Sequence, residues 1–345
     1  MKTVLVTGGA GFFGGVLKTR LLEAGHRCVS IDLCPDTDRH ANLTTIQGDI
    51  RDVAGLDRLY SQYRFDSVVH CAAVLAHAVK DENFLWTSNV DGTRNVAELA
   101  RKHGVPRVVF TSSNCLWGEA LNEPVTEDHE PNPIEIYGRS KYEGEKILRQ
   151  YGRDLNAIII RCPTIIDSGR LGLLSILFEF IDEGRRVWVV GGGRNRYQFI
   201  YAQDLADACM RSLDHQSSET LNIGSDNVKS LRDVFQYVID NAGSRSKVAS
   251  LPNKTTLLGM RLAYHAGVSP LGPYHYKMIA QDFQFHTGRI KSRLGWRPTL
   301  TNEEMLLRAY TYYSRNRQEI HNRGDVSAHR QAAKMGIIRV LKWVS

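Results

Sequence analysis

The sequence lacks the features that would place it among secreted, metal-binding or membrane-spanning proteins. Its six cysteines include no Cys-x-x-Cys pair, which indicates reduced thiols, predicts no metal site and favours a cytoplasmic protein. No run approaches the ~18 apolar residues of a membrane span, and a strand predicted from Lys2 leaves no room for a secretory leader. With 42% hydrophobic and 23% charged residues among 345, an ordinary globular protein is expected.

Hydrophobic periodicity alternates between strands and helices along the first half of the chain. We expect strands at 2–7, 28–33, 45–48, 67–72, 107–112 and 157–162, and helices near 16–22, 53–63, 84–103 and 137–151. This alternation predicts an α/β fold, a doubly wound parallel Rossmann sheet covered by helices on both faces. Shorter elements at 171–182, 187–190, 231–241 and 303–313 predict a smaller, interleaved α/β lobe.

Three parts of the chain are distinguished on this basis. Residues 1–165, with about 195–225, are expected to form an NAD-binding Rossmann domain. Residues of about 166–194 and 226–313 would form a substrate-binding lobe, and 314–345 a basic C-terminal tail.

A glycine-rich loop joins the first predicted strand to the first predicted helix. Gly8 permits a tight turn, Gly11 lets the backbone approach a pyrophosphate, and Gly14 lets the helix pack close to the sheet. The helix N-terminus adds amide donors and a favourable dipole. A lone glycine triplet is often a simple turn, but the flanking strand and helix favour dinucleotide binding.

Asp32 ends the second predicted strand. A carboxylate there accepts hydrogen bonds from the adenosine ribose and repels a 2′-phosphate, which favours NAD over NADP. Two alternatives stay open: Asp32 as a solvated turn residue, and Arg39 as a partner for the 2′-phosphate of NADP.

Tyr137 and Lys141 lie four residues apart on one predicted helix face. An ammonium close to a phenol favours the phenolate, which makes a general acid/base near neutral pH. Such a pair is common on exposed helices. The predicted strand at 107–112 favours the catalytic interpretation over an exposed pair. It leads into Thr111-Ser112-Ser113, whose hydroxyls can bind a substrate oxygen.

Together these motifs resemble the extended short-chain dehydrogenase/reductases, the NAD(P)-dependent epimerase/dehydratase family. The resemblance covers about residues 1–310. It is carried by TGGAGFFGG at 7–15, GDIRD at 48–52, HCAA at 70–73, SNVDGTRN at 88–95, TSSNCLWG at 111–118, YGRSK at 137–141, FIYAQDLADA at 199–208, LNIGS at 221–225 and LGWRP at 294–298.

The resemblance implies a role for each matching residue. Tyr137 would be the acid/base, Lys141 would hold the nicotinamide ribose and lower the pKa of Tyr137, and Ser113 would bind the reacting oxygen. A homodimer formed by the helices near 89–104 and 138–151 is also implied. The implied cofactor-binding residues are Gly8, Gly11, Phe12, Phe13, Gly14, Asp32, Asp49, Ile50, Ala72, Ala73, Asn89, Tyr137, Lys141 and Pro163.

Departures from the family pattern exclude some of the reactions that the family catalyses. Dehydratases and decarboxylases carry carboxylates directly after the hydroxyl residue, where this chain has Asn114 and Cys115. Cys115 matches a catalytic cysteine of GDP-fucose-synthase-like relatives, but no histidine lies between His129 and His215 to pair with it, so packing is favoured. What remains is hydride transfer at one secondary alcohol.

A second departure concerns the substrate. Tyr197 stands where nucleotide-sugar epimerases usually place a diphosphate-binding arginine. Arg194 and Arg196 beside it could bind an anion or form a solvated turn. The expected substrate contacts are Asn114, Arg194, Arg196 and Tyr197. This departure argues against a free nucleotide sugar and leaves room for a lipid-linked sugar or for a hydrophobic alcohol such as the substrates of 3β-hydroxysteroid-dehydrogenase-like relatives.

The net charge of +7 is unevenly distributed. Residues 315–345 carry +5, and their end has Ala333, Ile337, Val340, Leu341 and Val344 at helical spacing. A basic amphipathic helix of this kind binds membrane surfaces, although it could equally dock on the body of the protein or on a dimer mate. No nucleic-acid-binding motif accompanies the charge.

Three functions remain open. The favoured one is a 4-epimerase-type or ketoreductase reaction on a nucleotide- or lipid-linked sugar. The second is a 3β-hydroxysteroid-dehydrogenase-like or flavonol-type alcohol dehydrogenase or ketoreductase. The third is a non-catalytic NAD(P)-sensing regulator, which the presence of both Tyr137 and Lys141 disfavours.

Overall fold

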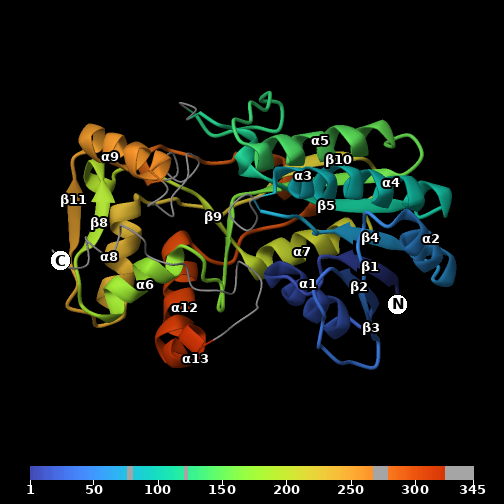
Figure 1. Cartoon of the computed structure of the whole chain (residues 1–345), viewed down its shortest axis with the longest axis horizontal. Coiled ribbons are helices and arrows are strands. Elements are labelled where there is room, and N and C mark those ends of the chain that lie inside the picture. The colour runs from blue at the N-terminus through green and yellow to red at the C-terminus, as the bar shows by residue number, and fades with distance from the viewer. Residues whose placement is uncertain (76–80, 120–122, 267–278, 323–345) are drawn as a thin grey trace.

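The computed structural model describes residues 1–75, 81–119, 123–266 and 279–322 (Figure 1). A seven-stranded sheet of entirely parallel strands forms its centre, in the order β10-β6-β5-β4-β1-β2-β3. These strands are β1 (Thr3–Thr7), β2 (Arg27–Asp32), β3 (Leu43–Gln47), β4 (Ser67–His70), β5 (Arg107–Ser113), β6 (Asn156–Cys162) and β10 (Glu219–Asn222). The doubly wound α/β fold predicted from the sequence is confirmed.

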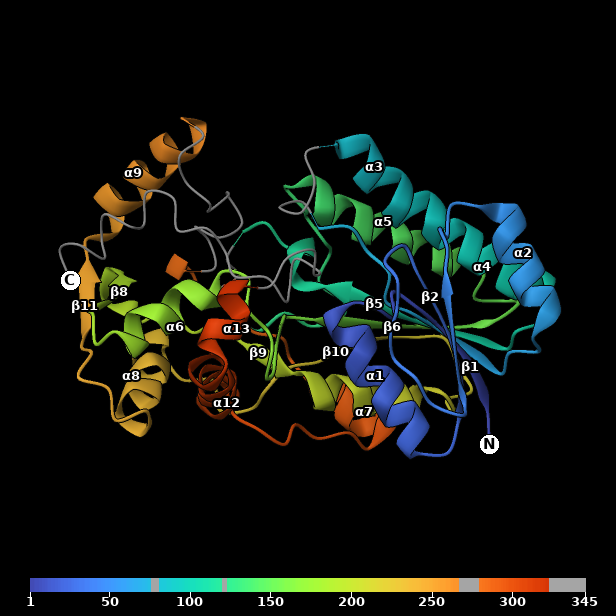
Figure 2. The ribbon, with the colours of Figure 1, turned by 60° about the horizontal axis from the view of Figure 1, so that its bottom comes forward.

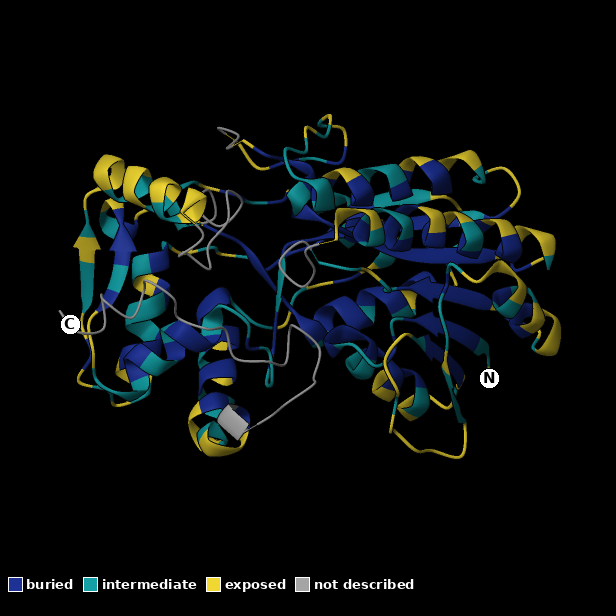
Figure 3. Cartoon of the chain, viewed as in Figure 1, coloured by how far each residue is buried: buried dark blue, intermediate teal, exposed yellow. Residues whose placement is uncertain are grey.

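Helices cover both faces of the sheet, as Figure 2 shows. One face is covered by α2 (Val53–Gln62), α4 (Gly92–Lys102) and α5 (Ile136–Gln150), whose leucines and valines form a core with β1, β4 and β5. The other face is covered by α1 (Phe12–Glu23), α7 (Ala202–Ser212) and α11 (Gly288–Leu294). Strands β5 and β6 at the centre of the sheet are almost wholly buried, because helices shield both of their faces from water (Figure 3).

The remaining elements form a second lobe beside the sheet. They are β7 (Thr164–Ile166), α6 (Leu174–Asp182), β8 (Val187–Val190), β9 (Phe199–Tyr201), α8 (Leu231–Asn241), β11 (Val248–Leu251), α9 (Asn253–His265), α12 (Asn302–Arg315) and α13 (Arg317–Asn322). Strand β11 pairs with β8, and β7 pairs with β9. Phe178, Val234, Met305 and Tyr313 lie in the core of this lobe.

Two segments differ from their predicted form. The long helix expected at 84–103 is divided into α3 (Glu82–Trp86), a π-helical turn (Thr87–Asp91) and α4. Residues 315–322, assigned to the tail from the sequence, continue the helical lobe: Ile320 is buried, and Arg317 donates to Asp182 at 2.9 Å and to Glu183 at 2.8 Å. The amphipathic helix predicted near 333–344 lies outside the described residues.

Among the described helices, none combines the length and the apolar character that crossing a bilayer requires. All six cysteines are free thiols.

Candidate active site

The parallel arrangement brings the functional segments to one edge of the sheet. Thr7 of β1 pairs with Ile31 of β2 on one side and with His70 of β4 on the other. The loops after β1, β2, β4 and β5 therefore start at the carboxyl edge, where ligands of doubly wound sheets bind.

The glycine loop is closely packed where the sequence predicted close approach. Gly8 has φ +77°, and a Cβ there would lie 2.7 Å from the Ala72 nitrogen. A Cβ on Gly14 would lie 2.1 Å from the Gly8 oxygen. At Gly11 the nearest atom to a Cβ would be that same oxygen at 3.1 Å, with no other atom within 4 Å among the described residues. The loop thus leaves space at Gly11 alone.

Helix α1 begins beside this space without a side-chain cap. Gly11 is its N-cap residue, and its first turn holds no acidic side chain. Uncapped amides at a helix N-terminus bind phosphate, so the residues present fit the pyrophosphate of a dinucleotide. The side chains of Phe12 and Phe13 are buried, which leaves their backbone amides as the groups available to a cofactor.

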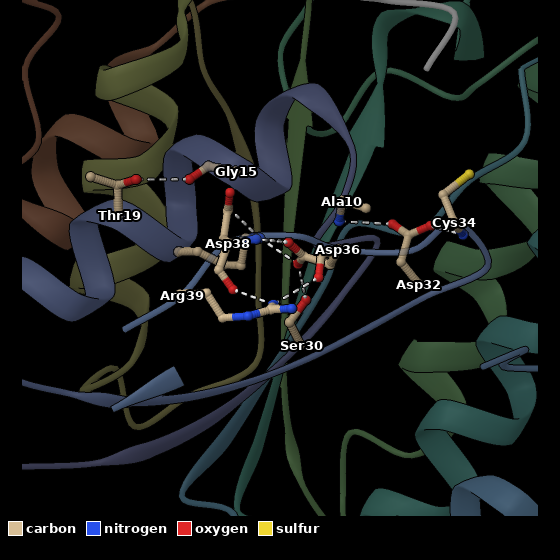
Figure 4. Close-up of polar contacts among 10 residues, drawn as sticks. Ala10, Gly15, Thr19, Ser30, Asp32, Cys34, Asp36, Asp38 and Arg39 are labelled. Carbon is tan, nitrogen blue, oxygen red and sulfur yellow. Dashed lines mark hydrogen bonds and ion pairs between the residues drawn. The ribbon is translucent and has the colours of Figure 1, made fainter. Parts of the chain in front are cut away.

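Asp32 lies at the end of β2, facing the glycine loop (Figure 4). Its carboxylate accepts hydrogen bonds from the backbone N–H of Ala10 at 3.0 Å and of Cys34 at 2.9 Å. These two donors hold the carboxylate at the place where the sequence predicted ribose recognition. Arg39 donates to the backbone oxygens of Asp36 and Asp38.

A buried ion pair, which the sequence analysis missed, connects Lys18 of α1 to Asp36 in the segment after β2. Lys18 of α1 is 1% exposed and contacts the carboxylate of Asp36. This carboxylate also accepts from the Ser30 hydroxyl at 3.1 Å (Figure 4). Lys18 also contacts Asp38 at 2.7 Å. The only sequence signal was a lysine on the apolar side of an otherwise regular helix.

The other predicted cofactor residues surround the same edge. Asp49 forms an ion pair with Arg51 at 2.6 Å, and this side-chain hydrogen bond is the main cause that lowers the pKa of Asp49. Ile50 and Pro163 are buried, and Ala73 is exposed. The Ala72 nitrogen donates to the Thr7 hydroxyl at 3.2 Å.

Asn89 supports the site from the π-helical turn. Its side chain accepts from the Val74 nitrogen at 2.7 Å and donates to the Val74 oxygen at 2.9 Å. It also donates to the Ser140 hydroxyl at 3.0 Å, and Ser140 donates to the Tyr137 carbonyl at 2.8 Å. Asn89 therefore connects the loop after β4 to the helix that carries Tyr137.

Ser113 is the last residue of β5, and Tyr137 and Lys141 lie in the first two turns of α5. The Ser113 hydroxyl accepts from the backbone N–H of Cys115 at 3.1 Å, and its side chain also lowers the pKa of the neighbouring Tyr137. Lys141 is 3% exposed, and its ammonium nitrogen lies 3.9 Å from the centre of the Phe110 ring. Burial lowers the pKa of Lys141 to about 8.

The electrostatics of Tyr137 differ from the expectation that Lys141 lowers its pKa. Burial raises the pKa of Tyr137 above its ordinary value, and the neighbouring Cys115 and Cys162 act in the same direction. The Ser113 side chain and the Arg170 guanidinium lower it. Arg170, which the sequence analysis missed, belongs to the loop after β7 and donates to the Ile165 carbonyl at 3.2 Å.

A buried charge network lies behind this centre. Glu145, one turn after Lys141, is fully buried and accepts from the Ser112 hydroxyl at 2.6 Å and from Arg161 at 2.8 Å. Since these residues belong to α5, β5 and β6, the network fixes the helix of Tyr137 against the sheet.

The predicted substrate residues separate into two groups. Asn114 and Tyr197 are both buried and contact each other, with the Asn114 amide donating to the Tyr197 hydroxyl at 2.6 Å. Arg194 and Arg196 are exposed on the segment before β9. The structure therefore brings Tyr197 into contact with Asn114, the residue that follows Ser113, and leaves the two arginines at the surface.

Comparison with known proteins agrees with this architecture. Residues 4–224 match the model of the NAD dependent epimerase/dehydratase family. The chain belongs to this family. Membership confirms the resemblance inferred from the sequence and makes the protein an NAD-dependent enzyme of the epimerase/oxidoreductase type.

Two relatives of this protein are similar to it over most of its length. The protein y4nG of Sinorhizobium fredii, described as uncharacterized, is 35% identical over 99% of this chain and 86% of its own length. A putative UDP-glucose 4-epimerase of Methanocaldococcus jannaschii is 30% identical over 71% of this chain and 84% of its own.

Solved structures of the same fold are similar over nearly the whole molecule. A UDP-glucose 4-epimerase of Thermotoga maritima, solved with UDP-glucose, has a TM-score of 0.76 at 22% identity, covering 91% of this chain and 99% of that one. MoeE5, solved with UDP-glucuronic acid and NAD, has a TM-score of 0.74 at 24% identity over 91% and 99% of the two chains.

Proposed function

We propose that this enzyme interconverts an alcohol and a ketone at one carbon of a sugar that is linked to a nucleotide or a lipid, as a 4-epimerase or a ketoreductase. One observation carries the proposal: Ser113 at the end of β5 is near enough to the Tyr137 phenol to lower its pKa, and Lys141 is buried four residues further along the same helix. The sugar-nucleotide relatives and solved structures support the substrate class.

Each side chain has a distinct task in this reaction. The Tyr137 oxygen removes the proton from the substrate hydroxyl and returns it in the reverse direction. Ser113 donates a hydrogen bond to the reacting oxygen, and Lys141 would hold the nicotinamide ribose. When bound at the glycine loop, NAD supplies the acceptor and donor of the hydride. Neither Asn114 nor Cys115 is a carboxylate, so elimination of water or of carbon dioxide lacks its acid/base.

Replacement of the phenol tests the catalytic assignment. Tyr137→Phe should lower kcat by at least about a hundredfold while NAD affinity, measured by fluorescence titration, stays close to wild type. Tyr142→Phe is the matched control on the same helix, since the Tyr142 hydroxyl donates to Glu130 away from the centre. Equal turnover in Tyr137→Phe and the control would refute the assignment.

Cofactor stoichiometry distinguishes the two enzymatic hypotheses. The protein is incubated with trace NAD⁺ and a panel of nucleotide-linked and polyprenyl-linked sugars, beside steroid and flavonol alcohols. Epimerised sugar without net NADH indicates an epimerase, whereas turnover limited by added cofactor indicates a dehydrogenase or reductase. Activity confined to the steroid or flavonol alcohols would favour the second hypothesis.

We also infer a cytoplasmic homodimer that pairs α4 and α5 with their symmetry mates, and peripheral membrane contact through the basic tail. Light scattering after size exclusion tests the dimer, with a monomer mass as the contrary result. Deletion from Ser327 tests the tail by vesicle co-sedimentation, and equal sedimentation with and without residues 327–345 would reject this contact.

A further inference from the structure

Helix α9 exposes leucines to solvent on the second lobe. Leu258 is 60% exposed and Leu262 63%, and no residue of this 13-residue helix is buried. Among the described residues only six large apolar side chains are exposed, and α9 holds three of them, the third being Tyr264. Figures 1 and 3 show α9 on the outer side of the lobe, away from the seven-stranded sheet.

Cations lie on the same face as the leucines. With 3.6 residues per turn, Lys254, Leu258, Arg261, Leu262 and His265 fall within an arc of about 100°. Neither Lys254 nor Arg261 has an ion-pair partner among the described residues. The face therefore combines unshielded positive charge with apolar side chains.

The positive charge of the chain is concentrated in two segments of the sequence, one of which contains this helix. Residues 241–281 contain five Lys/Arg and no Asp or Glu, which gives them a net charge of +5. Residues 315–345 carry another +5, so the rest of the chain has a net charge of −3. The body that holds the glycine loop and Tyr137 is thus slightly acidic, and the positive charge belongs to two segments outside it.

This distribution of positive charge indicates which partner could bind the exposed face of α9. A second copy of α9 would bring Lys254 and Arg261 against like charges, and the basic tail would do the same. An anionic surface satisfies both halves of the face, because phosphates attract the cations while the leucines enter the acyl boundary.

We propose that α9 binds the surface of a bilayer containing anionic lipids, with Leu258 and Leu262 inserted between head groups and Lys254 and Arg261 beside lipid phosphates. The helix lies in the interface and does not cross it. This surface is separate from the catalytic centre proposed above and does not depend on that assignment.

Vesicle flotation of the full chain tests the proposal, with phosphatidylcholine alone or mixed with phosphatidylglycerol. Wild type should bind the mixed vesicles and bind phosphatidylcholine weakly. Leu258→Ser/Leu262→Ser should lower the partition coefficient about tenfold, because apolar area no longer leaves water. Lys254→Gln/Arg261→Gln should lower it roughly fivefold per cation, on the mixed vesicles only.

Matched variants control for charge and for exposed apolar area. Arg58→Gln/Arg64→Gln removes two exposed cations from the nucleotide-binding side, and Val53→Ser removes a side chain that is 52% exposed. Both should bind like wild type. All four variants should keep the wild-type Tm and turnover of a soluble substrate, so loss of catalysis alone would concern the proposed function and not this surface.

Three results would overturn the proposal. The first is no binding to the mixed vesicles, and the second is wild-type binding by Leu258→Ser/Leu262→Ser, which would assign binding to another segment. The third is a lower oligomeric mass of that variant in light scattering with unchanged vesicle binding, which would make a second copy the occupant.

Discussion

The Asn114 amide donates a 2.6 Å hydrogen bond to the Tyr197 hydroxyl, across 83 positions of sequence. Asn114 directly follows Ser113 at the end of β5, whereas Tyr197 precedes β9 and its carbonyl accepts from Asn302 at 2.8 Å. The contact therefore connects the carboxyl end of β5 to the second lobe, and both residues are buried.

Loss of this contact should destabilise the protein measurably. Tyr197→Phe removes the acceptor and leaves the buried Asn114 amide without it, so the free energy of unfolding should fall by about 1–3 kcal/mol. Denaturant unfolding of Tyr197→Phe, of Asn114→Ala and of the double variant gives the coupling energy between the two side chains, expected near 1 kcal/mol. Ser61→Ala, which removes an exposed hydroxyl, should change nothing. A coupling energy of zero would contradict the prediction.

Lys141 should make stability depend on pH. Its pKa is about 8 in the folded protein and 10.5 when unperturbed, so between these values the unfolded chain binds more protons and folding gains stability as pH rises. Lys141→Met should therefore be more stable than cofactor-free wild type at pH 7, by on the order of 3 kcal/mol at most. The difference should shrink toward pH 10, while turnover is lost.

The measurement is the unfolding free energy of both proteins from pH 7 to pH 10. Lys146→Met on the exposed side of α5 should show no such trend. A difference between Lys141→Met and wild type that stays constant with pH would contradict the assigned pKa.

Asp32 should control the choice of cofactor. Asp32→Ser removes the carboxylate that would face a 2′-phosphate, so the ratio of kcat/KM for NADP to that for NAD should rise about tenfold or more. If Arg39 turns from its backbone contacts to bind the phosphate, adding Arg39→Gln should abolish the gain. An unchanged ratio in Asp32→Ser would assign the selectivity to other residues.

The buried Lys18–Asp36 pair should be costly to break. Lys18→Met leaves a buried carboxylate without its cation, which typically destabilises by about 3–5 kcal/mol. Lys18→Met/Asp36→Asn should recover part of that loss. Lys2→Met disrupts a pair whose Asp214 side chain is 80% exposed, and should cost less than about 1 kcal/mol. Equal losses from the two lysines would show that burial does not strengthen the inner pair.

Two glycines should respond oppositely to alanine. Gly14→Ala places a methyl 2.1 Å from the Gly8 oxygen, so it should displace the glycine loop, lower Tm and weaken NAD binding. Gly259→Ala in α9 meets no described atom within 4 Å and should stabilise by about 0.5–1 kcal/mol through helix propensity. Thermal unfolding with and without NAD measures both effects, and tolerance of Gly14→Ala would contradict the close packing.

The parts of the site that the sequence predicted are those set by local signals. The glycine loop follows from its place between a strand and a helix, and the Tyr137–Lys141 pair follows from helical spacing. The π-helical turn at Thr87–Asp91 had no local signal, because its Asn89 bonds to Val74 and Ser140 only after the loop after β4 and α5 come together. The effect of Arg170 on Tyr137 was missed for the same reason.

The sequence by itself determined the α/β class and the family, and it predicted the dinucleotide loop and the Tyr137–Lys141 pair, since hydrophobic period and glycine placement act over a few residues. Only the tertiary structure decided that Asn114 contacts Tyr197, that Lys18 is buried against Asp36, and that the leucines of α9 meet water. Those outcomes depend on which distant segments pack together at the sheet edge and on which helix face meets solvent. The spacing of residues within one helix or strand determines neither.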